Sequence, residues 1–482
     1  MRHRVGAVLA PAVFILFLAL PMTGLTPPAH RLAAVLAAVV VLWVTEALPL
    51  PVTALVGAAA CVVLRVAPAK EVFAPFADPL MFLFIGAFIL ARAIFLHGLD
   101  RRVAYGVLSL PWVGARPSRI LLAFGAVTAL ISGWISNTAT TAMMFGIGLS
   151  ILAALQAPGA GIKIDPRYAS ALMLMTSFAA SVGGLATPVG TPPNVIGLGF
   201  IRSQLGVEIS FFRWMLIGVP VVLVLFAFLY AYLNAVAPAG VKELPAGEEL
   251  LWGERDRLGP WTRGQRSVAI AFGVTVGLWV LPGLVAIVLG EGSTAYQALN
   301  QRLPEGVAAL VGAALLFVLP GDHGPAITWQ DAVQIDWGVV LLYGGGFALG
   351  VLSFQTGLAE AMGRSLTGLL PIEGSFGLLV ASVVVAVLLS ETTSNTAAAN
   401  MVVPVVISVA RAAGLDPLEP TLGATMAASL GFMLPVSTPC NAIVYGSGYI
   451  PLGRMMRYGL ALDLAGIVVI VALVRLLTPL IR

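Results

Sequence analysis

The chain has 482 residues, of which 59% are hydrophobic and 10% are charged, whereas a soluble domain carries about 25% charged residues. This composition excludes a soluble globular domain and predicts an all-α polytopic membrane protein. The formal net charge of +4 is small and reflects basic loops, so it gives no indication of nucleic acid binding. Cys61 and Cys440 both fall in apolar segments, which excludes a disulfide framework and leaves the redox compartment open.

The apolar runs predict about 11 transmembrane helices, because each run is long enough to cross a bilayer. The first run follows Arg2 and Arg4, has Pro21 near its end and lacks a clear small-residue cleavage site. We therefore interpret it as a retained helix rather than as a signal peptide. The predicted crossings cover residues 6–24, 32–48, 52–66, 80–97, 169–203, 214–235, 267–288, 305–319, 337–355, 421–450 and 458–479.

Two further apolar stretches, 120–153 and 375–410, have small polar residues at their centres. We expect each to be a re-entrant hairpin that enters and leaves the membrane on the same side. With the N-terminus in the cytoplasm, this topology places most Lys and Arg residues in cytoplasmic segments. It also keeps the polar linker 236–266 cytoplasmic and predicts an extracytoplasmic C-terminus.

The two halves of the chain repeat. The hexapeptide at 54–59 recurs unchanged at 309–314, and a Ser-Asn-Thr tripeptide at 136–138 recurs at 394–396, with nearly the same spacing. Because the two hairpins would enter from opposite sides, we predict inverted-topology repeats, a pattern of secondary transporters. The predicted parts are residues 1–31 (first helix and loop), 32–235 (repeat 1, with the broken helix 169–203), 236–266 (cytoplasmic linker) and 267–482 (repeat 2, with the broken helix 421–450).

Four stretches carry small hydroxyls, amides, glycines and prolines where a membrane helix would carry Leu and Val. They are the two tripeptides and the later segments 187–194 and 435–441. Pro192 and Pro193 remove N–H donors and break a helix, and unpaired backbone at membrane depth is tolerated only inside protein or along a wet cavity. Helix-to-helix bonding or a simple proline kink is the structural alternative, but the duplication favours a binding site.

The chemistry of these stretches suits two kinds of ligand. Hydroxyl and carbonyl oxygens suit a hard monovalent cation, and amide or backbone N–H groups at a helix N-terminus suit a carboxylate. The segments 120–153, 169–201 and 421–450 contain no charged residue or His, and 375–410 contains only Glu391. An anion would therefore find no arginine there, and co-bound Na⁺ would supply the missing charge.

Three ionisable residues stand out within predicted crossings or hairpins, namely Glu46, Arg92 and Glu391. Such residues are costly in a membrane unless they are paired or hydrated. We expect Glu391 to accept backbone N–H bonds in its hairpin, with assistance to cation binding as the alternative. Pairing of Glu46 with Arg92 stays open. The chain shows no nucleophile–base set, metal cluster or phosphate loop, so we predict neither an enzyme nor an organic cofactor.

At these residues the chain resembles the divalent anion:sodium symporter family, the dicarboxylate and citrate carriers. The resemblance covers nearly the whole chain and rests on the paired Ser-Asn-Thr and Thr-Pro motifs. It implies a homodimer surrounded by lipid in a bacterial inner membrane, with a scaffold domain and a transport domain that moves like an elevator. It also implies two or more Na⁺ sites and a small dianionic substrate.

The resemblance implies particular ligands. The sodium ligands would be Ser132, Ser136, Asn137 and Gly190 in the first site, and Ser390, Ser394, Asn395 and Ser437 in the second. The substrate carboxylates would contact Asn137, Thr138, Thr191, Asn395, Thr396, Thr438 and Pro439.

The sequence departs from the family pattern at the second site. Cys440 stands where the family usually has proline, and Ser390 and Ser437 stand where Thr and Ala are more usual. We expect sodium-coupled symport of C4-dicarboxylates such as succinate, malate or fumarate. A sodium-independent dicarboxylate exchanger, or a sulfate or citrate carrier on the same fold, is the alternative. A passive channel is the remaining class, and single-channel currents would reveal it.

Overall fold

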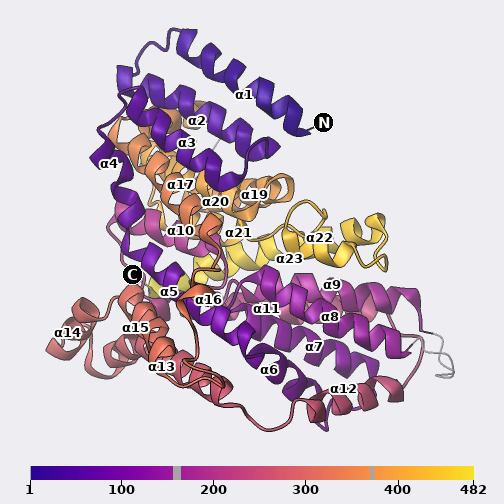
Figure 1. The fold of residues 1–482 in the computed structure, drawn as a ribbon. Helices are drawn as coiled ribbons and strands as arrows, with labels where there is room; N and C mark the ends of the chain where they lie inside the picture. The colour runs from indigo at the N-terminus through magenta and orange to yellow at the C-terminus, as the bar shows by residue number, and fades with distance from the viewer. Residues whose placement is uncertain (1, 156–163, 370–373, 482) are drawn as a thin grey trace.

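The computed structural model describes residues 2–155, 164–369 and 374–481 (Figure 1). Regular structure in these ranges is helical, apart from one isolated β-bridge between Pro320 and Pro325. The prediction of an all-α polytopic membrane protein is confirmed.

The first half of the chain holds α1 (Arg2–Ala19), α2 (Pro27–Thr45), α3 (Leu50–Val63), α4 (Ala69–Phe73), η1 (Ala74–Ala77), α5 (Pro79–Leu96), α6 (Leu99–Leu108), α7 (Pro117–Ser132), α8 (Asn137–Leu155), α9 (Pro166–Gly183), α10 (Pro192–Phe200), η2 (Ile201–Leu205) and α11 (Phe211–Val236). The second half holds α12 (Pro245–Arg257), α13 (Arg263–Leu289), α14 (Thr294–Arg302), α15 (Glu305–Val318), α16 (Trp329–Ala332), α17 (Trp337–Gln355), α18 (Leu358–Leu369), α19 (Gly374–Thr392), α20 (Asn395–Ala412), α21 (Leu418–Ala427), α22 (Pro439–Tyr445), α23 (Leu452–Leu477) and η3 (Thr478–Leu480).

The helix starts follow from local sequence. Asp78 and Asp165 precede prolines, and their carboxylates accept the free N–H groups of Leu80 and Arg167 at 2.9 and 2.8 Å. Proline tolerates the first helical position because its missing N–H has no partner there, and an Asp side chain satisfies the next donor. The same cap-then-proline pattern therefore begins both α5 and α9.

Within the described ranges, nine helices are long and apolar enough to cross a membrane. A tenth span results if α14 and α15, bent by 62°, count as one. The sequence predicted about 11 crossings, and five of these are not among the nine. The helices at 6–24, 52–66 and 305–319 are too short, and the crossings at 169–203 and 421–450 are broken. Three of the nine are arms of the predicted hairpins (α8, α19 and α20), so their lengths do not decide whether the hairpins are re-entrant.

Several elements were not predicted. The linker 236–266 contains the helix α12, and the short helices α6 and α18 follow α5 and α17. Both short helices begin just after a glycine with positive φ, Gly98 at 63° and Gly357 at 82°. That conformation strongly favours glycine, so each glycine lets the chain turn sharply out of the preceding helix.

The two halves pack on each other through equivalent residues. α5 lies along α15, and α17 lies along α3. A methyl group added at Gly86 of α5 would lie 2.6 Å from the backbone carbon of Ala309, and one at Gly345 of α17 would lie 2.9 Å from that of Ala54. Ala54 and Ala309 begin the repeated hexapeptide, and Gly86 and Gly345 are separated by nearly the same spacing as the repeat. The glycine of each half therefore packs on the hexapeptide of the other half.

The helices gather into regions that meet at the four polar stretches. In Figure 1, α1–α3 and α17–α20 lie at the top, α13–α15 at the lower left, and α7–α9 with α12 at the lower right. α22 packs on α8 and α9 of the first half, and α10 packs on α20 and α21 of the second. The broken helices of both halves are thereby interleaved.

Candidate functional site

The first tripeptide lies in the turn between α7 and α8. α7 ends at Ser132, whose Oγ lies 2.7 Å from the side-chain amide of Asn137, the first residue of α8. The Asn137 amide satisfies its neighbours when its nitrogen points to the carbonyls of Ala180 and Gly190, at 3.1 and 3.2 Å. The structure therefore brings together Ser132, Asn137 and Gly190, three of the four residues predicted for the first sodium site.

Glycines make this close approach possible. A methyl group at Gly183 would lie 2.2 Å from the Ala129 carbonyl oxygen, and one at Gly184 would lie 2.5 Å from Asn137 Oδ1. A methyl group at Gly190 would lie 2.5 Å from the Gly184 oxygen. Real Cβ atoms do not come this close, so the turn of the hairpin and the break in the helix fit together only because these residues lack side chains.

Asn194 closes the first unwound segment. Its Nδ2 donates to the carbonyls of Gly184 and Thr187 at 3.0 and 2.8 Å. The Gly184 carbonyl has no helical partner, because residue 188, four positions further on, is a proline without an N–H group. The Thr187 carbonyl accepts only a turn bond, from the Gly190 N–H at 3.3 Å, among the described backbone groups. Asn194 Oδ1 is buried and accepts no hydrogen bond from the residues that the structure describes, which leaves one amide oxygen free for water or a ligand.

The second cluster repeats this arrangement. Ser390 Oγ donates to Asn395 Oδ1 at 2.8 Å, and Asn395 Nδ2 donates to the Ser429 carbonyl at 3.2 Å. Asn441 Nδ2 donates to the carbonyls of Gly431 and Leu434 at 2.9 and 3.0 Å. The Ser132–Asn137 and Ser390–Asn395 pairs and the bonds of Asn194 and Asn441 are therefore equivalent in the two halves, whereas the carbonyls that Asn137 and Asn395 reach are not.

Glu391 is the exception to this equivalence. Its Oε1 accepts the N–H of Met433 at 2.7 Å, and its Oε2 accepts the N–H of Leu434 at 3.3 Å and the hydroxyl of Ser437 at 2.8 Å. The predicted role as a backbone acceptor holds, but the donors lie in the second broken stretch and not in the hairpin. Ser437, expected to offer its backbone to sodium, uses its hydroxyl to hold Glu391.

The two clusters are directly connected. Ser177 of α9 donates its hydroxyl to Asn441 Oδ1 at 2.6 Å. The thiol of Cys440 adjoins the hydroxyls of Thr138 and Thr438. A side chain from the second break therefore reaches the first tripeptide, and the predicted residues form one continuous region.

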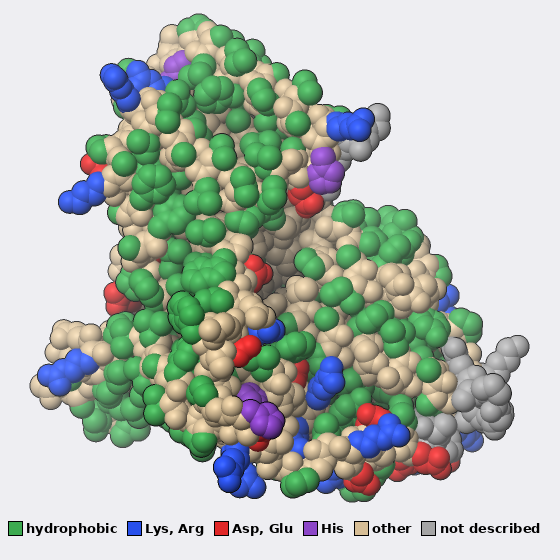
Figure 2. All heavy atoms as spheres, in the orientation of Figure 1, with side chains coloured by type: hydrophobic (Ala, Val, Ile, Leu, Met, Phe, Trp, Pro, Cys, Tyr) green, Lys and Arg blue, Asp and Glu red, His purple; other side chains and the backbone are tan. Residues whose placement is uncertain are grey.

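The other predicted residues serve as helix caps or face outwards. The hydroxyls of Ser394 and Thr438 accept the N–H groups of Ala397 and Asn441 at 3.2 and 3.1 Å, and Thr191 is the residue before α10. The backbone carbonyl of Ser136 accepts the Thr140 N–H at 3.0 Å. The backbone carbonyl of Thr396 accepts the Asn400 side-chain amide at 3.0 Å. Thr138 and Pro439 are exposed, whereas Asn137, Asn395 and Thr396 are half-buried. Figure 2 shows a hollow between the upper part of the molecule, with α1–α3 and α20, and the lower right part, with α7–α9.

The donor set suits a hard cation and an anion together. α8, α10 and α20 begin at Asn137, Pro192 and Asn395, and the N-terminus of a helix attracts an anion. Hydroxyl, amide and backbone oxygens are ligands for hard cations. Asn194 Oδ1 in the first cluster and the buried hydroxyl of Ser429 in the second lack a hydrogen-bond partner within the described ranges, so each cluster has a polar atom to spare.

The other two ionisable residues singled out in the sequence, Glu46 and Arg92, do not pair with each other among the described residues. Arg92 Nη2 donates to Gln334 Oε1 at 2.5 Å. Glu46 ends α2 with a left-handed backbone, φ 51°, and its carbonyl lies 2.6 Å from a ring nitrogen of His3. Arg92 is therefore held by an amide, and no ion pair between Arg92 and Glu46 occurs among the described residues.

Two carboxylates at helix starts outside the membrane have lowered pKa values. The hydroxyl of Thr262 and the N–H groups of Gly264 and Arg263 hold the pKa of Asp322 below its usual range. The hydrogen bond from the Arg167 guanidinium does the same for the pKa of Asp165. These groups fix the starts of α13 and α9 and lie outside the candidate site.

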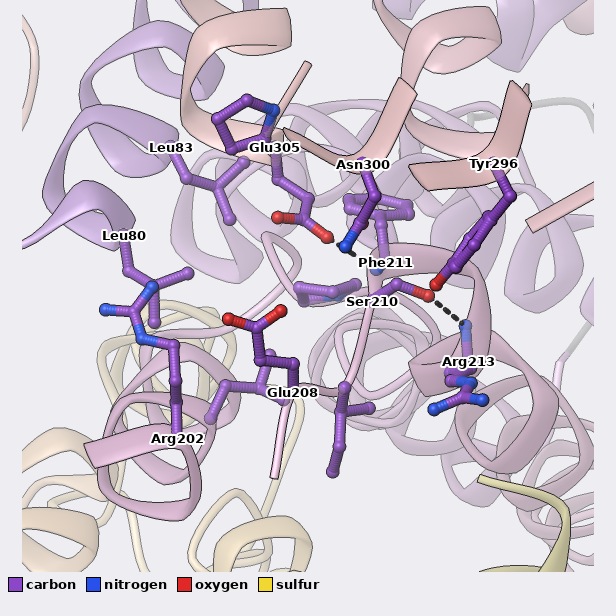
Figure 3. Close-up of a pocket in the computed structure, with 14 residues that line it drawn as sticks. Leu80, Leu83, Arg202, Glu208, Ser210, Phe211, Arg213, Tyr296, Asn300 and Glu305 are labelled. Carbon is purple, nitrogen blue, oxygen red and sulfur yellow. Dashed lines mark hydrogen bonds between the residues drawn. The ribbon is translucent and has the colours of Figure 1, made fainter. Parts of the chain in front are cut away.

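A separate pocket of about 150 Å³ was not predicted from the sequence (Figure 3). Of the four polar stretches, only Pro188 lines it. Its two arginines are already paired, Arg202 with Asp78 and Arg213 with Glu291. Its lining also includes the carboxylates of Glu208 and Glu305. The pocket therefore offers a dianion no free basic side chain, and it does not replace the tripeptides as the candidate site.

The fold has relatives among solved structures. It matches the Alcanivorax borkumensis YdaH transporter with a TM-score of 0.55 at 14% identity, over 98% of this chain and 97% of that one. It also matches Neisseria gonorrhoeae MtrF with a TM-score of 0.55 at 12% identity, over 94% of this chain and 95% of that one. Both matches show that the chain shares its fold with these two proteins.

The family follows from sequence comparison. Residues 2–481 match the family model of the sodium:sulfate symporter transmembrane region. The sodium-dependent dicarboxylate transporter SdcS of Staphylococcus saprophyticus is 35% identical over 98% of this chain and 91% of its own length. SdcS of Staphylococcus aureus strain USA300 is 33% identical over 99% of this chain and 91% of its own length. The chain belongs to the divalent anion:sodium symporter family, and the resemblance drawn from its motifs is confirmed.

Proposed function

We propose that this transporter imports C4-dicarboxylates such as succinate, malate and fumarate together with Na⁺. The observation that carries the proposal is the duplicated cluster, in which a Ser–Asn pair meets the carbonyls of a broken helix. The named relatives are sodium-dependent dicarboxylate transporters, and that activity agrees with a site whose motifs offer oxygens and amides but no basic side chain.

In this proposal the substrate lies between the tripeptides. One carboxylate binds at Asn137 and Thr138, and the other at Asn395 and Thr396, each at the N-terminus of a long helix. Thr191, Thr438 and Pro439 border the space between them. The exposure of Thr138 and Pro439 supports this position, because a substrate needs an approach from water.

Two sodium ions flank the substrate in this proposal. Their ligands are Ser132, Ser136, Asn137 and Gly190 in the first site and Ser390, Ser394, Asn395 and Ser437 in the second. Their charges offset the dianion. Each positive charge beyond two gains about 2.3 kcal/mol per 100 mV of membrane potential, so coupling to Na⁺ concentrates the substrate in the cytoplasm.

The transport movement is proposed to follow the elevator type. The hairpins 120–153 and 375–410 are re-entrant, the repeats 32–235 and 267–482 are inverted, and the protein is a homodimer in the lipid of a bacterial inner membrane. The N-terminus is cytoplasmic and the C-terminus extracytoplasmic. The reciprocal packing of Gly86 and Gly345 on the opposite halves supports a two-fold relation between the repeats.

A second candidate function is favoured by two observations. The hydroxyl of Ser437 is engaged by Glu391, and the family model is described by sulfate rather than by dicarboxylates. A sodium-independent dicarboxylate exchanger, or a sulfate or citrate carrier on the same fold, would fit a weakened second sodium site.

Uptake into proteoliposomes tests the proposal. Radiolabelled succinate is offered with an inward Na⁺ or choline gradient, to vesicles that are empty or preloaded with dicarboxylate. We expect uptake only with Na⁺ and into empty vesicles, and loss of uptake in the folded variants Asn137→Ala and Asn395→Ala. The matched control is Asn234→Ala, at an exposed position of α11.

Other outcomes separate the alternatives. Uptake that requires internal dicarboxylate but not Na⁺ identifies an exchanger. Uptake of sulfate or citrate in place of succinate assigns the substrate to the second candidate. Wild-type uptake from both asparagine variants contradicts the assigned site.

A further inference from the structure

A buried carboxyl group near the second cluster has no role in the function described above. Asp463 lies in the middle of α23 and is 2% exposed. Neither of its carboxyl oxygens has a hydrogen-bond partner among the residues that the structure describes. An ionised carboxylate in such a place is strongly unfavourable, so this side chain requires a compensating ligand.

The position of Asp463 on its helix directs it to the second unwound segment. Gly459, Asp463 and Gly466 follow the i, i+4, i+7 pattern, so they share one face of α23. A methyl group at Gly459 would lie 2.3 Å from the Phe432 oxygen, and one at Gly466 would lie 2.5 Å from a methyl carbon of Leu430. This face is therefore in direct contact with the break, and there Asp463 faces Glu391 of α19.

Glu391 has hydrogen-bond donors of its own. It is 3% exposed, and it accepts hydrogen bonds from the N–H groups of Met433 and Leu434 and from the hydroxyl of Ser437. Asp463 accepts no hydrogen bond of ordinary length and angle from the described residues, and the Phe432 N–H is the backbone donor near it. Asp463 is therefore the member of the pair that lacks compensation.

No side chain on the packed helices supplies the missing positive charge within the described part of the chain. The elements packed against α23 are α11, α19, α21 and η3. Their charged groups, and those of α23 itself, are held elsewhere: Arg213 of α11 pairs with Glu291, Arg475 pairs with Glu419 of α21 three turns away from Asp463, and Arg454 bonds Ser170. Arg457 of α23 is exposed, in contrast to the buried Asp463. The remaining titratable groups on these helices are the tyrosines Tyr230, Tyr232 and Tyr458.

Two buried carboxyl groups that face each other do not both remain ionised without a cation. We propose that Asp463, which faces Glu391, binds one further monovalent cation, a proton or a sodium ion, beside the second sodium site. The coupling part of this inference rests on the proposed function. Because Glu391 also holds Met433, Leu434 and Ser437, loss of the cation would repel Glu391 and loosen the second break.

The first test measures stability and does not depend on transport. The purified protein is melted in choline buffer from about pH 6 to about pH 9, with and without Na⁺. A folded state that binds a cation is stabilised by that cation. We therefore expect the melting temperature of the wild type to fall as the pH rises. The melting temperature of Asp463→Asn, which carries no charge at this position, should fall less. Asp256→Asn, at an exposed position of α12, is the control and should follow the wild type.

The source of the cation decides which condition restores stability. If the ligand is a proton, the difference between wild type and Asp463→Asn depends on pH and is the same with and without Na⁺. If it is sodium, added Na⁺ at high pH removes the difference. If the melting temperatures of the two proteins depend identically on pH and Na⁺, the inference is overturned. It is also overturned if the melting temperature of the wild type in choline does not change with pH.

The second test counts charges during transport. In proteoliposomes, Asp463→Asn should move one positive charge fewer per succinate than the wild type. The loss should appear either in the Na⁺ flux ratio or in the proton flux. Equal stoichiometry overturns the coupling. If succinate is not carried but the melting difference persists, the cation site stands and the proposed function fails. Sodium-coupled uptake with identical melting supports the proposed function and overturns the cation site.

Discussion

The bond between Ser177 and Asn441 joins the two halves of the protein at the candidate site, and its contribution can be measured. Asn441 makes three bonds, to the carbonyls of Gly431 and Leu434 and from the hydroxyl of Ser177. A buried hydrogen bond contributes about 1 kcal/mol. We expect Asn441→Ala to lower the unfolding free energy by about 3 kcal/mol.

Asn194 provides the matched comparison. It occupies the equivalent position in the first half but makes only two of these bonds, so Asn194→Ala should cost about 2 kcal/mol. Ser177→Ala should cost about 1 kcal/mol, because it removes one bond. On the Asn441→Ala background it should cost almost nothing, since its partner is already absent.

The assay is equilibrium unfolding of the purified protein in mixed detergent, for the wild type, the three single variants and the Ser177→Ala/Asn441→Ala double variant. Ser150→Ala serves as control, because Ser150 bonds only its own helix, at 3.0 Å to the Gly146 carbonyl. Additive costs of Ser177→Ala and Asn441→Ala would refute the reasoning. So would an Asn194 variant that is less stable than the Asn441 variant.

Three further predictions concern other parts of the chain. Cys440→Pro should leave stability within about 0.5 kcal/mol, because a helix tolerates proline in its first turn, but it should change the KM for succinate uptake. Asp322 contributes stability above its unfolded pKa, and this is lost as the pH falls through the lower folded pKa; Asp322→Asn should therefore flatten the melting temperature below about pH 4. Gly86→Ala should lower the melting temperature strongly, because its methyl group meets the Ala309 backbone, whereas Gly106→Ala, with open space around it, should raise it.

The sequence indicated which residues come together in the candidate region better than it indicated their hydrogen-bond partners. The duplicated Ser-Asn-Thr and Thr-Pro-X-Asn motifs indicated which helices break, and the structure brings Ser132, Asn137 and Gly190 together. The partners of Glu391 could not be predicted, since its donors lie about 40 residues away in a segment whose fold depends on tertiary contacts.

Asp463 was overlooked, although a signal was present. A single carboxylate in the centre of the apolar run 458–479 is as unusual as Glu46, Arg92 or Glu391. The short helices α6 and α18 and the linker helix α12 were also overlooked. They are amphipathic or polar, and a search for apolar runs of spanning length does not detect them.

The reciprocal contacts of Gly86 with Ala309 and Gly345 with Ala54 have a consequence for how the polypeptide can be divided. Each half completes the other's packing, so neither half expressed alone would have its glycine surface covered. A chain cut between α12 and α13 should still assemble when both fragments are made in the same cell. The peptide connection then serves chiefly to guarantee that the two fragments are produced in equal numbers.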